Sequence, residues 1–462
     1  MKTVVVVGGG ITGLCTMHYL TKKLKENNEE ARLVLIEKNS YLGGKMHSVY
    51  EKDYIMETGA DSIVARHPGV LELIQELHYE SEVVYNETGI SYIHTNNKLH
   101  AIPAGSIFGI PMDETSLMAS TLISPEGKKR VMQDAEIPNT KFTKESSIGE
   151  FLEYFLGEEI VKKQIAPVLA GVYSGNLYEL SLNSTLPYLV DYKNNYGSIM
   201  KGFEANRGKY ERDANKKFIS FKKGLTGLIN QLEGSLPEVE IMKNTAAERV
   251  TKSDNGYELS LANGEKIQAD VVVLACPNQV VRQVVADSEI NELLNQFTDA
   301  STITMYLGFD LPDSILPADG TGFIVSHNSD LICNASTWTS RKWKHTSSNG
   351  NLLVRLFYKS SNSRYEELRG MSDEELAEVA LQDIKLSLNI EEKPAVVNIR
   401  KWIDAMPKYD LAHNEALQKV LTQFDVKFPS LFIAGCSYFG VGIGACIENG
   451  KKTADKIFQV IK

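Results

Sequence analysis

Residues 2–14 read Lys-Thr-Val-Val-Val-Val-Gly-Gly-Gly-Ile-Thr-Gly-Leu, and this stretch decides the fold. Four consecutive valines are β-branched and apolar, as expected of a strand buried on both faces of a parallel sheet. Gly8 allows a tight turn, Gly10 lets backbone amides approach a pyrophosphate, and Gly13 lets the following helix pack closely on the strand. The stretch therefore predicts a dinucleotide-binding loop at the start of a βαβ unit. Its predicted cofactor-binding residues are Gly8, Gly9, Gly10, Ile11, Thr12 and Gly13.

A second apolar run, residues 32–36, closes the βαβ unit and ends on Glu37. Glu37 lies 24 residues after Gly13 (37 − 13), close to the roughly 20-residue spacing of an acid that binds a ribose diol. A carboxylate there repels a 2′-phosphate, so NADP is disfavoured. We expect Glu37 and the adjacent Lys38 to contact the cofactor.

Composition narrows the class of protein. The chain has 462 residues, with 49 basic and 59 acidic side chains and a net charge of −10, which argues against nucleic acid as a partner. Its length predicts two or three domains. The N-terminus lacks the pattern of a signal peptide, and no apolar run reaches the length of a membrane span, so we expect a cytoplasmic protein. Five scattered cysteines and nine histidines show no metal-ligand spacing, and we expect no protein-bound metal.

Two further stretches of small residues follow the first loop. Residues 43–45 are a glycine pair and a lysine, and we expect Gly44 and Lys45 to lie along the phosphates of the cofactor. The second stretch is a turn of small and polar residues. Its predicted cofactor-binding residues are Gly59, Ala60, Asp61 and Ser62.

Together these motifs resemble the flavin-containing amine oxidase superfamily, and within it the porphyrinogen oxidases of haem biosynthesis. Residues 167–175 with 179–181, the block 338–343 and the strand 431–435 are similar to successive blocks of the Gram-positive branch of that family. The resemblance covers essentially the whole chain. It implies FAD as the cofactor.

The resemblance and the motif order predict an α/β fold: a Rossmann-like FAD-binding domain, a substrate domain built on a mixed sheet, and a helical lobe. We expect the FAD-binding domain to be assembled from residues 1–80, 216–290 and 406–462. Residues 81–215 would form the helical lobe and part of the substrate region, and 291–405 the substrate-domain sheet.

The resemblance also implies cofactor contacts in the second half of the chain. The segment 431–462 reads as a second strand, glycine loop and helix, whose first amides would face the flavin carbonyls. The family usually has proline and aspartate where Gly444 and Ala445 stand, which removes an anion from this loop. The residues expected at the flavin are Val250, Trp402, Gly435, Val441, Gly442 and Ile443.

Four residues match substrate-binding positions of the family: Arg66, His67, Tyr92 and Gly171. A basic pair at positions 66 and 67 helps to bind propionates, and the second residue is usually lysine. A neutral imidazole attracts carboxylates less strongly than lysine does, so Arg66 is the stronger candidate. The alternative is a solvated pair at a helix start. Neither the motifs nor the resemblance assigns a catalytic acid or base.

Two segments receive structural predictions that bear on the site. A helix starting at Ser147, with apolar residues 148, 151, 152 and 155, predicts the core of a helix bundle, and contact with a bilayer surface is the alternative. Residues 192–217 are rich in Asn, Lys and Gly, and we expect a partly ordered connection.

The implied activity is FAD-dependent oxidation of coproporphyrinogen III to coproporphyrin III, with three O₂ reduced to three H₂O₂. Protoporphyrinogen IX is the alternative substrate. Less favoured alternatives are an amine oxidase or carotenoid desaturase on the same fold, and a non-enzyme that retains the fold. We expect transient contact with a ferrochelatase, because such an enzyme would accept the porphyrin. The sequence also allows peripheral attachment to the inner face of the membrane.

Overall fold

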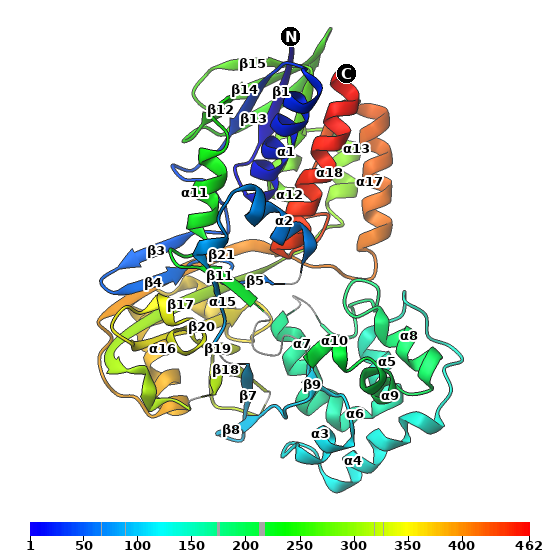
Figure 1. Ribbon diagram of the computed structural model, residues 1–462, viewed down its shortest axis with the longest axis vertical. Helices are drawn as coiled ribbons and strands as arrows, with labels where there is room; N and C mark the ends of the chain where they lie inside the picture. Colours follow the sequence, from blue (N-terminus) through cyan, green and yellow to red (C-terminus); the bar gives the residue numbers. More distant parts are fainter. Residues whose placement is uncertain (66, 88, 173–175, 212–217, 318, 327) are drawn as a thin grey trace.

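The computed structural model describes residues 1–462 except 66, 88, 173–175, 212–217, 318 and 327. Figure 1 shows three parts: a layered α/β domain that contains both termini, a second large sheet, and a lobe of short helices.

A five-stranded parallel sheet forms the centre of the α/β domain. The strands at residues 2–7 and 271–274 consist largely of valine, and the first is completely buried from Val4 to Val6. The chain supplies these strands from distant segments. In spatial order they are β12 (Val239–Met242), β2 (Ala31–Ile36), β1 (Lys2–Val7), β16 (Val271–Leu274) and β22 (Leu431–Ile433).

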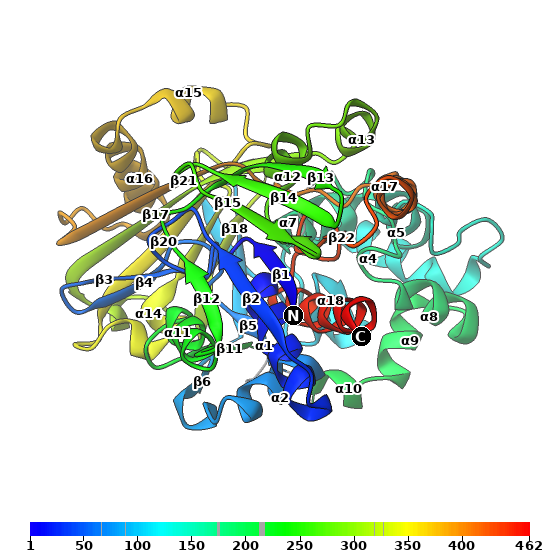
Figure 2. The ribbon, with the colours of Figure 1, turned by 90° about the horizontal axis from the view of Figure 1, so that it is seen from above.

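Two layers cover this sheet. On one face, α1 (Ile11–Asn27) and α18 (Ile443–Ile461) lie side by side (Figure 2), and their apolar residues share a core with two further helices. On the other face lies a three-stranded meander with helices beside it. The remaining elements of the two layers are α2 (Pro68–Glu76), α11 (Thr226–Gly234), β13 (Ala247–Ser253), β14 (Gly256–Leu261), β15 (Lys266–Ala269), α12 (Asn278–Val285), α13 (Ser288–Leu294) and α17 (His413–Lys427).

The second sheet has seven strands and is mixed. One face carries an apolar core with helices α15 (Tyr365–Gly370) and α16 (Asp373–Leu388), and the other face looks toward the α/β domain. A two-residue turn at Asn96 and Asn97, both with positive φ, joins the last two strands of this sheet as a hairpin. The strand order is β21 (Val396–Pro407), β17 (Asp299–Pro312), β20 (Asn351–Lys359), β19 (Ala335–Trp338), β18 (Gly320–Val325), β7 (Ile90–Thr95) and β8 (Lys98–Ala101).

Short elements connect the two sheets. The hairpin β3 (Ser48–Glu51) and β4 (Tyr54–Glu57) leads from the α/β domain toward the second sheet, and α14 (Thr339–Lys342) follows β19. A small sheet also forms from β5 (Ile63–Val64), β11 (Phe218–Phe221) and β6 (Val83–Tyr85).

The helical lobe has its own apolar core. Ser147 caps α5 by accepting a hydrogen bond from the backbone of Glu150, and Phe151, Leu152 and Phe155 are completely buried. The helix-bundle interpretation is therefore confirmed for these residues. The lobe contains α3 (Glu114–Ala119), α4 (Pro125–Met132), α5 (Ile148–Leu156), α6 (Glu158–Ile160), a π-helical turn (Val161–Ile165), α7 (Ala166–Val172), α8 (Tyr188–Tyr196), α9 (Ile199–Ala205) and α10 (Gly208–Glu211).

The prediction of a partly ordered connection is wrong for residues 192–211, which lie in α8, α9 and α10. A buried ion pair explains why a polar segment folds here. Lys193 and Asp134 are 2.8 Å apart with side chains almost fully buried, and Asp134 also accepts from the hydroxyl and backbone that begin α9. These polar groups form hydrogen bonds with one another instead of with water. Residues 212–217 lie outside the described part of the chain.

Candidate flavin and substrate site

Three loops that the sequence singled out meet at the carboxyl ends of the parallel strands. The backbone of Gly43 donates to the carbonyl of Gly9 (2.8 Å), and Ala60 donates to the carbonyl of Lys45 (2.9 Å). Ligands of open α/β sheets bind at this edge. The structure therefore gathers the predicted cofactor-binding segments at the place where the fold predicts a ligand.

The glycines of the first loop differ in what surrounds them. Gly8 has φ +112°, and a Cβ there would lie 2.4 Å from the carbonyl oxygen of Ala275. A Cβ at Gly13 would lie 2.0 Å from the carbonyl oxygen of Gly8, so helix and strand pack as closely as expected. Within the described part of the chain, a Cβ at Gly10 would meet no neighbouring atom within 4 Å. This combination fits a loop whose middle faces a ligand while its ends pack against protein.

Glu37 is held in place by its neighbours. It is 6% exposed and accepts hydrogen bonds from the backbone of Gly9 (2.9 Å) and from the backbone and side chain of Asn39 (2.8 and 2.7 Å). The carboxylate thus bridges the glycine loop and the end of β2. Lys38 is exposed beside it.

The second strand, loop and helix reaches the same edge from the C-terminal end of the chain. Gly435 has φ +99° and donates to the side chain of Asn449 (2.8 Å), and it faces the side chain of Thr12. The helix α18 begins after Gly442, which has no side chain to cap its first amides. Val441 and Gly442 are exposed, and Ile443 is partly exposed. A helix start with free amides suits an anionic group.

Side chains of the seven-stranded sheet hold the loop of residues 58–61. Trp402 donates its indole N–H to the carbonyl of Thr58 (2.7 Å), and Arg355 donates to the carbonyls of Thr58 (3.3 Å) and Gly59 (2.8 Å). Lys342 lies 3.1 Å from Asp61, whose other oxygen accepts from Ser62. Burial alone would raise the pKa of Asp61, but Lys342 and Arg355 outweigh it and lower the pKa to about 2. The loop is thus fixed to the second sheet by charge and hydrogen bonds.

A buried carboxyl group supports the same loop from the other side. Glu57 is 4% exposed and accepts from the hydroxyl of Ser48 (3.0 Å) and the backbone of Leu225 (2.8 Å). Burial raises the pKa of Glu57 to about 7, although these hydrogen bonds oppose the change.

Two predicted cofactor residues, Lys45 and Val250, lie in surroundings that the motifs did not predict. The ammonium of Lys45 donates to the carbonyl of Ala405 and lies 3.7 Å from the sulfur of Cys436, so it points toward β21 and not along the glycine loop. Val250 is buried in the middle of β13, while Thr245 donates to the backbone carbonyl of Glu37.

The predicted substrate-binding residues separate into groups. Gly171 is near the end of α7, where a Cβ would touch Ile324 of β18. Tyr92 lies on the opposite face of that sheet, with its ring 5.6 Å from the ring of Trp338, because side chains alternate along β7. The structure therefore does not bring Tyr92 and Gly171 together. Arg66 lies outside the described residues.

His67 precedes α2 and packs on the first turn of α18. A Cβ at Gly444 would lie 2.5 Å from its imidazole ring. Two of the positions at which the sequence departs from the family pattern, 67 and 444, are therefore in contact, and the small residue at 444 makes room for the ring at 67.

Sequence reasoning missed Arg355, Lys342 and Glu57. Arg355 is 2% exposed and lies between Val354 and Leu356, within the otherwise apolar run of residues 352–357. A cation in such a run was a signal that it has a buried partner. No comparable signal marked Lys342, because only the fold brings it to Asp61.

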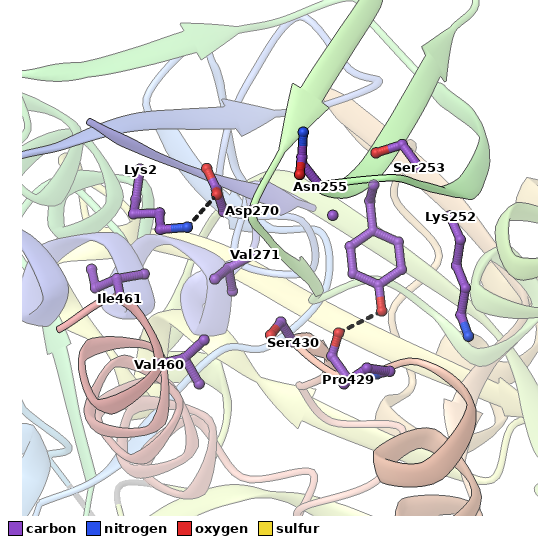
Figure 3. A pocket seen from close by; sticks show the side chains of 12 residues that line it. Lys2, Lys252, Ser253, Asn255, Asp270, Val271, Pro429, Ser430, Val460 and Ile461 are labelled. Atoms are coloured by element: carbon purple, nitrogen blue, oxygen red, sulfur yellow. Dashed lines mark hydrogen bonds and ion pairs between the residues drawn. The ribbon is translucent and has the colours of Figure 1, made fainter.

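A solvent-open pocket of about 370 Å³ lies at the opposite, amino edge of the parallel sheet (Figure 3). Some of its polar groups pair with one another: Lys2 pairs with Asp270 (2.7 Å), and Tyr257 donates to the carbonyl of Pro429 (2.6 Å). This pocket is remote from the glycine loops and is not part of the candidate site.

Comparison with known proteins agrees with this geometry. The model of the family described as flavin containing amine oxidoreductase matches residues 11–458. The chain is 32% identical to coproporphyrinogen III oxidase of Bacillus subtilis, over 97% of this chain and 96% of the relative. It is 29% identical to coproporphyrinogen III oxidase of Staphylococcus aureus, over 99% of both chains.

A crystal structure from Exiguobacterium sp. 255-15, named provisionally as a protoporphyrinogen oxidase, has the same fold. It superposes with a TM-score of 0.88 at 31% identity and covers 99% of this chain and 98% of its own. The glycine loops, the buried Glu37 and the second helix start fit the dinucleotide and flavin ends of FAD. The chain therefore belongs to the flavin containing amine oxidoreductase family and is a flavoprotein oxidoreductase.

Proposed function

We propose that this protein oxidises coproporphyrinogen III to coproporphyrin III, with bound FAD as the first electron acceptor and O₂ as the final one. The observation that carries this proposal is the full-length similarity to the coproporphyrinogen III oxidase of Bacillus subtilis. The reaction removes six electrons and six protons from the tetrapyrrole, and three O₂ take them up as three H₂O₂.

The flavin supplies the electron chemistry when bound, since it accepts a hydride from carbon. The residues of this chain hold the cofactor and direct its position. Gly8–Gly13 and Glu37 would bind its dinucleotide half, and Trp402, Arg355 and Lys342 fix the 58–61 loop beside it. The free amides at the start of α18 would stabilise negative charge on the reduced ring.

Protoporphyrinogen IX is a second candidate substrate, favoured by the name of the similar crystal structure. It has two propionates where coproporphyrinogen III has four. The discriminating feature is therefore the number of cationic side chains that face the substrate.

Steady-state turnover in air tests the proposal. We expect porphyrin fluorescence to rise with coproporphyrinogen III, at a higher kcat/KM than with protoporphyrinogen IX, and H₂O₂ to accumulate at three per porphyrin. A higher kcat/KM with protoporphyrinogen IX would make that compound the preferred substrate instead of coproporphyrinogen III. No fluorescence gain with either, from protein that contains FAD, would refute both.

We further propose transient contact with a ferrochelatase and peripheral contact with the inner face of the membrane. Exposed apolar side chains on the helical lobe support the second proposal: Met118, Met132 and Tyr154 are 47, 37 and 39% exposed. In the described part of the chain, no helix has both the length and the apolar character needed to cross a bilayer. Co-sedimentation with vesicles of bacterial lipid tests this, and unchanged protein in the supernatant would contradict it.

A further inference from the structure

Lys359 lies on the same face of the seven-stranded sheet as Trp402. In the strand register Thr302 pairs with Lys359 on one side and with Trp402 on the other. Side chains directly opposite one another in an antiparallel pair share a face, and neighbouring strands are about 4.8 Å apart. Lys359 is therefore about 10 Å from Trp402, across one intervening strand.

The ammonium of Lys359 reaches the end of α7. It donates to the carbonyls of Ala170 (2.6 Å) and Gly171 (3.3 Å), and Gly171 is a predicted substrate-binding residue. The side chain remains partly exposed. Lys359 thus connects the face that carries Trp402 with the segment that carries Gly171.

The charge of Lys359 is not neutralised by an acidic side chain within the part of the chain that the structure describes. Both of its hydrogen-bond partners are neutral carbonyls, and burial lowers the pKa of Lys359 to about 8. Taking a cation out of water without a counter-ion costs free energy. An incoming carboxylate would offset that cost, and an ammonium with two hydrogen bonds has a third N–H to donate.

We propose that Lys359 binds a propionate carboxylate of the substrate. This inference rests on the proposed function. It assigns a cationic side chain to the substrate site, at a position that no sequence motif marks.

Lys401 provides a matched control on the same sheet. It lies on the opposite face, in register with Ile303, and donates to the carbonyls of Met371 (2.6 Å) and Arg369 (3.3 Å) at the end of α15. Lys401→Met therefore removes the same charge and the same kind of helix-end contact, away from the proposed carboxylate.

The test measures binding of the product, coproporphyrin III, and of its neutral tetramethyl ester by quenching of porphyrin fluorescence, in the FAD-containing protein. We expect Lys359→Met to weaken binding of the acid about tenfold, the size of one charge-assisted hydrogen bond at a partly exposed site. Binding of the ester should change less than about twofold. Lys359→Arg should restore most of the affinity for the acid, and Lys401→Met should bind as the wild type does.

Three results would overturn the inference: unchanged affinity of Lys359→Met for the acid, an equal loss for acid and ester, or an equal loss in Lys401→Met. Equal loss for acid and ester would assign Lys359 a purely structural role at α7. Failure of the proposed function gives a different result, since the wild type would then bind neither porphyrin and oxidise neither porphyrinogen.

Discussion

Glu57 is a buried carboxyl group whose ionisation opposes folding. Its pKa is raised from 4.5 to about 7 by burial, so the folded protein keeps a proton that the unfolded chain releases at lower pH. The stability from this group is complete below pH 4.5 and is lost as pH rises through about 7. The full effect is about 3 kcal/mol.

We therefore expect Glu57→Gln to gain stability relative to the wild type as pH rises from 5 to 8. Thermal unfolding midpoints of both proteins across that range measure the change. A constant difference between them at every pH would show that Glu57 does not titrate in this window. Ser48→Ala is a useful control, because it removes a hydrogen-bond donor to the same carboxyl and adds no charge.

Arg355 is the buried cation that joins the second sheet to the 58–61 loop. Its guanidinium lies over the rings of Tyr306 (5.1 Å) and Phe357 (4.6 Å) while it donates to Thr58 and Gly59. Arg355→Met leaves these carbonyls and the nearby Asp61 without that partner. We expect a loss of about 3–5 kcal/mol in stability and a lower FAD-to-protein ratio, read from the flavin absorbance.

Arg355→Lys retains the charge but not the forked geometry, and we expect an intermediate FAD content. If Arg355→Met kept the wild-type FAD content and unfolding midpoint, the loop would not depend on this side chain.

The first turn of α18 contacts the start of α2 through Gly444 and His67. A side chain at position 444 would overlap the ring of His67. We expect Gly444→Ala to cost about 1–3 kcal/mol by overpacking and His67→Ala in the same protein to relieve most of that cost. Chemical denaturation of the two single variants and the double variant measures the coupling, and simple additivity would contradict it.

The helical lobe depends on the buried pair of Lys193 and Asp134. Removing one partner leaves an uncompensated charge, so Lys193→Met should destabilise the protein by about 3–5 kcal/mol. The double variant Lys193→Met/Asp134→Asn should cost less than the sum of the two single changes. Urea unfolding of all four proteins gives the coupling, and a single-variant loss below about 1 kcal/mol would show that the pair contributes little.

Periodicity predicted the elements that pack by a simple rule. The strand of valines follows one hydrophobic pattern, the helix that starts after Ser147 follows one capping signal and one helical period, and both are present. The prediction failed at α8, because local composition does not reveal that Asp134 lies next to Lys193 across the lobe. Polar residues that pair at long range look like solvated ones in sequence.

In the whole molecule, the motifs that the sequence contains come together where the second sheet faces the carboxyl edge of the parallel sheet. The first glycine loop and Glu37 could be predicted because a dinucleotide requires particular residue types at particular spacings, whereas the family resemblance implied Gly435. Lys342, Arg355 and Lys359 could not, because their roles arise only when the second sheet closes on the α/β domain. Side chains on successive residues of a strand point to opposite faces of the sheet, and this places Tyr92 on the face away from Gly171. A match of motifs to a family does not show which face a residue occupies.

Anaerobic mixing of the purified protein with coproporphyrinogen III tests the central claim most directly. We expect the absorbance of bound oxidised flavin to be bleached without O₂ and to return when air is admitted, with porphyrin fluorescence appearing. If the flavin stays oxidised during this mixing, while dithionite reduces it in the same preparation, the protein is not a coproporphyrinogen oxidase.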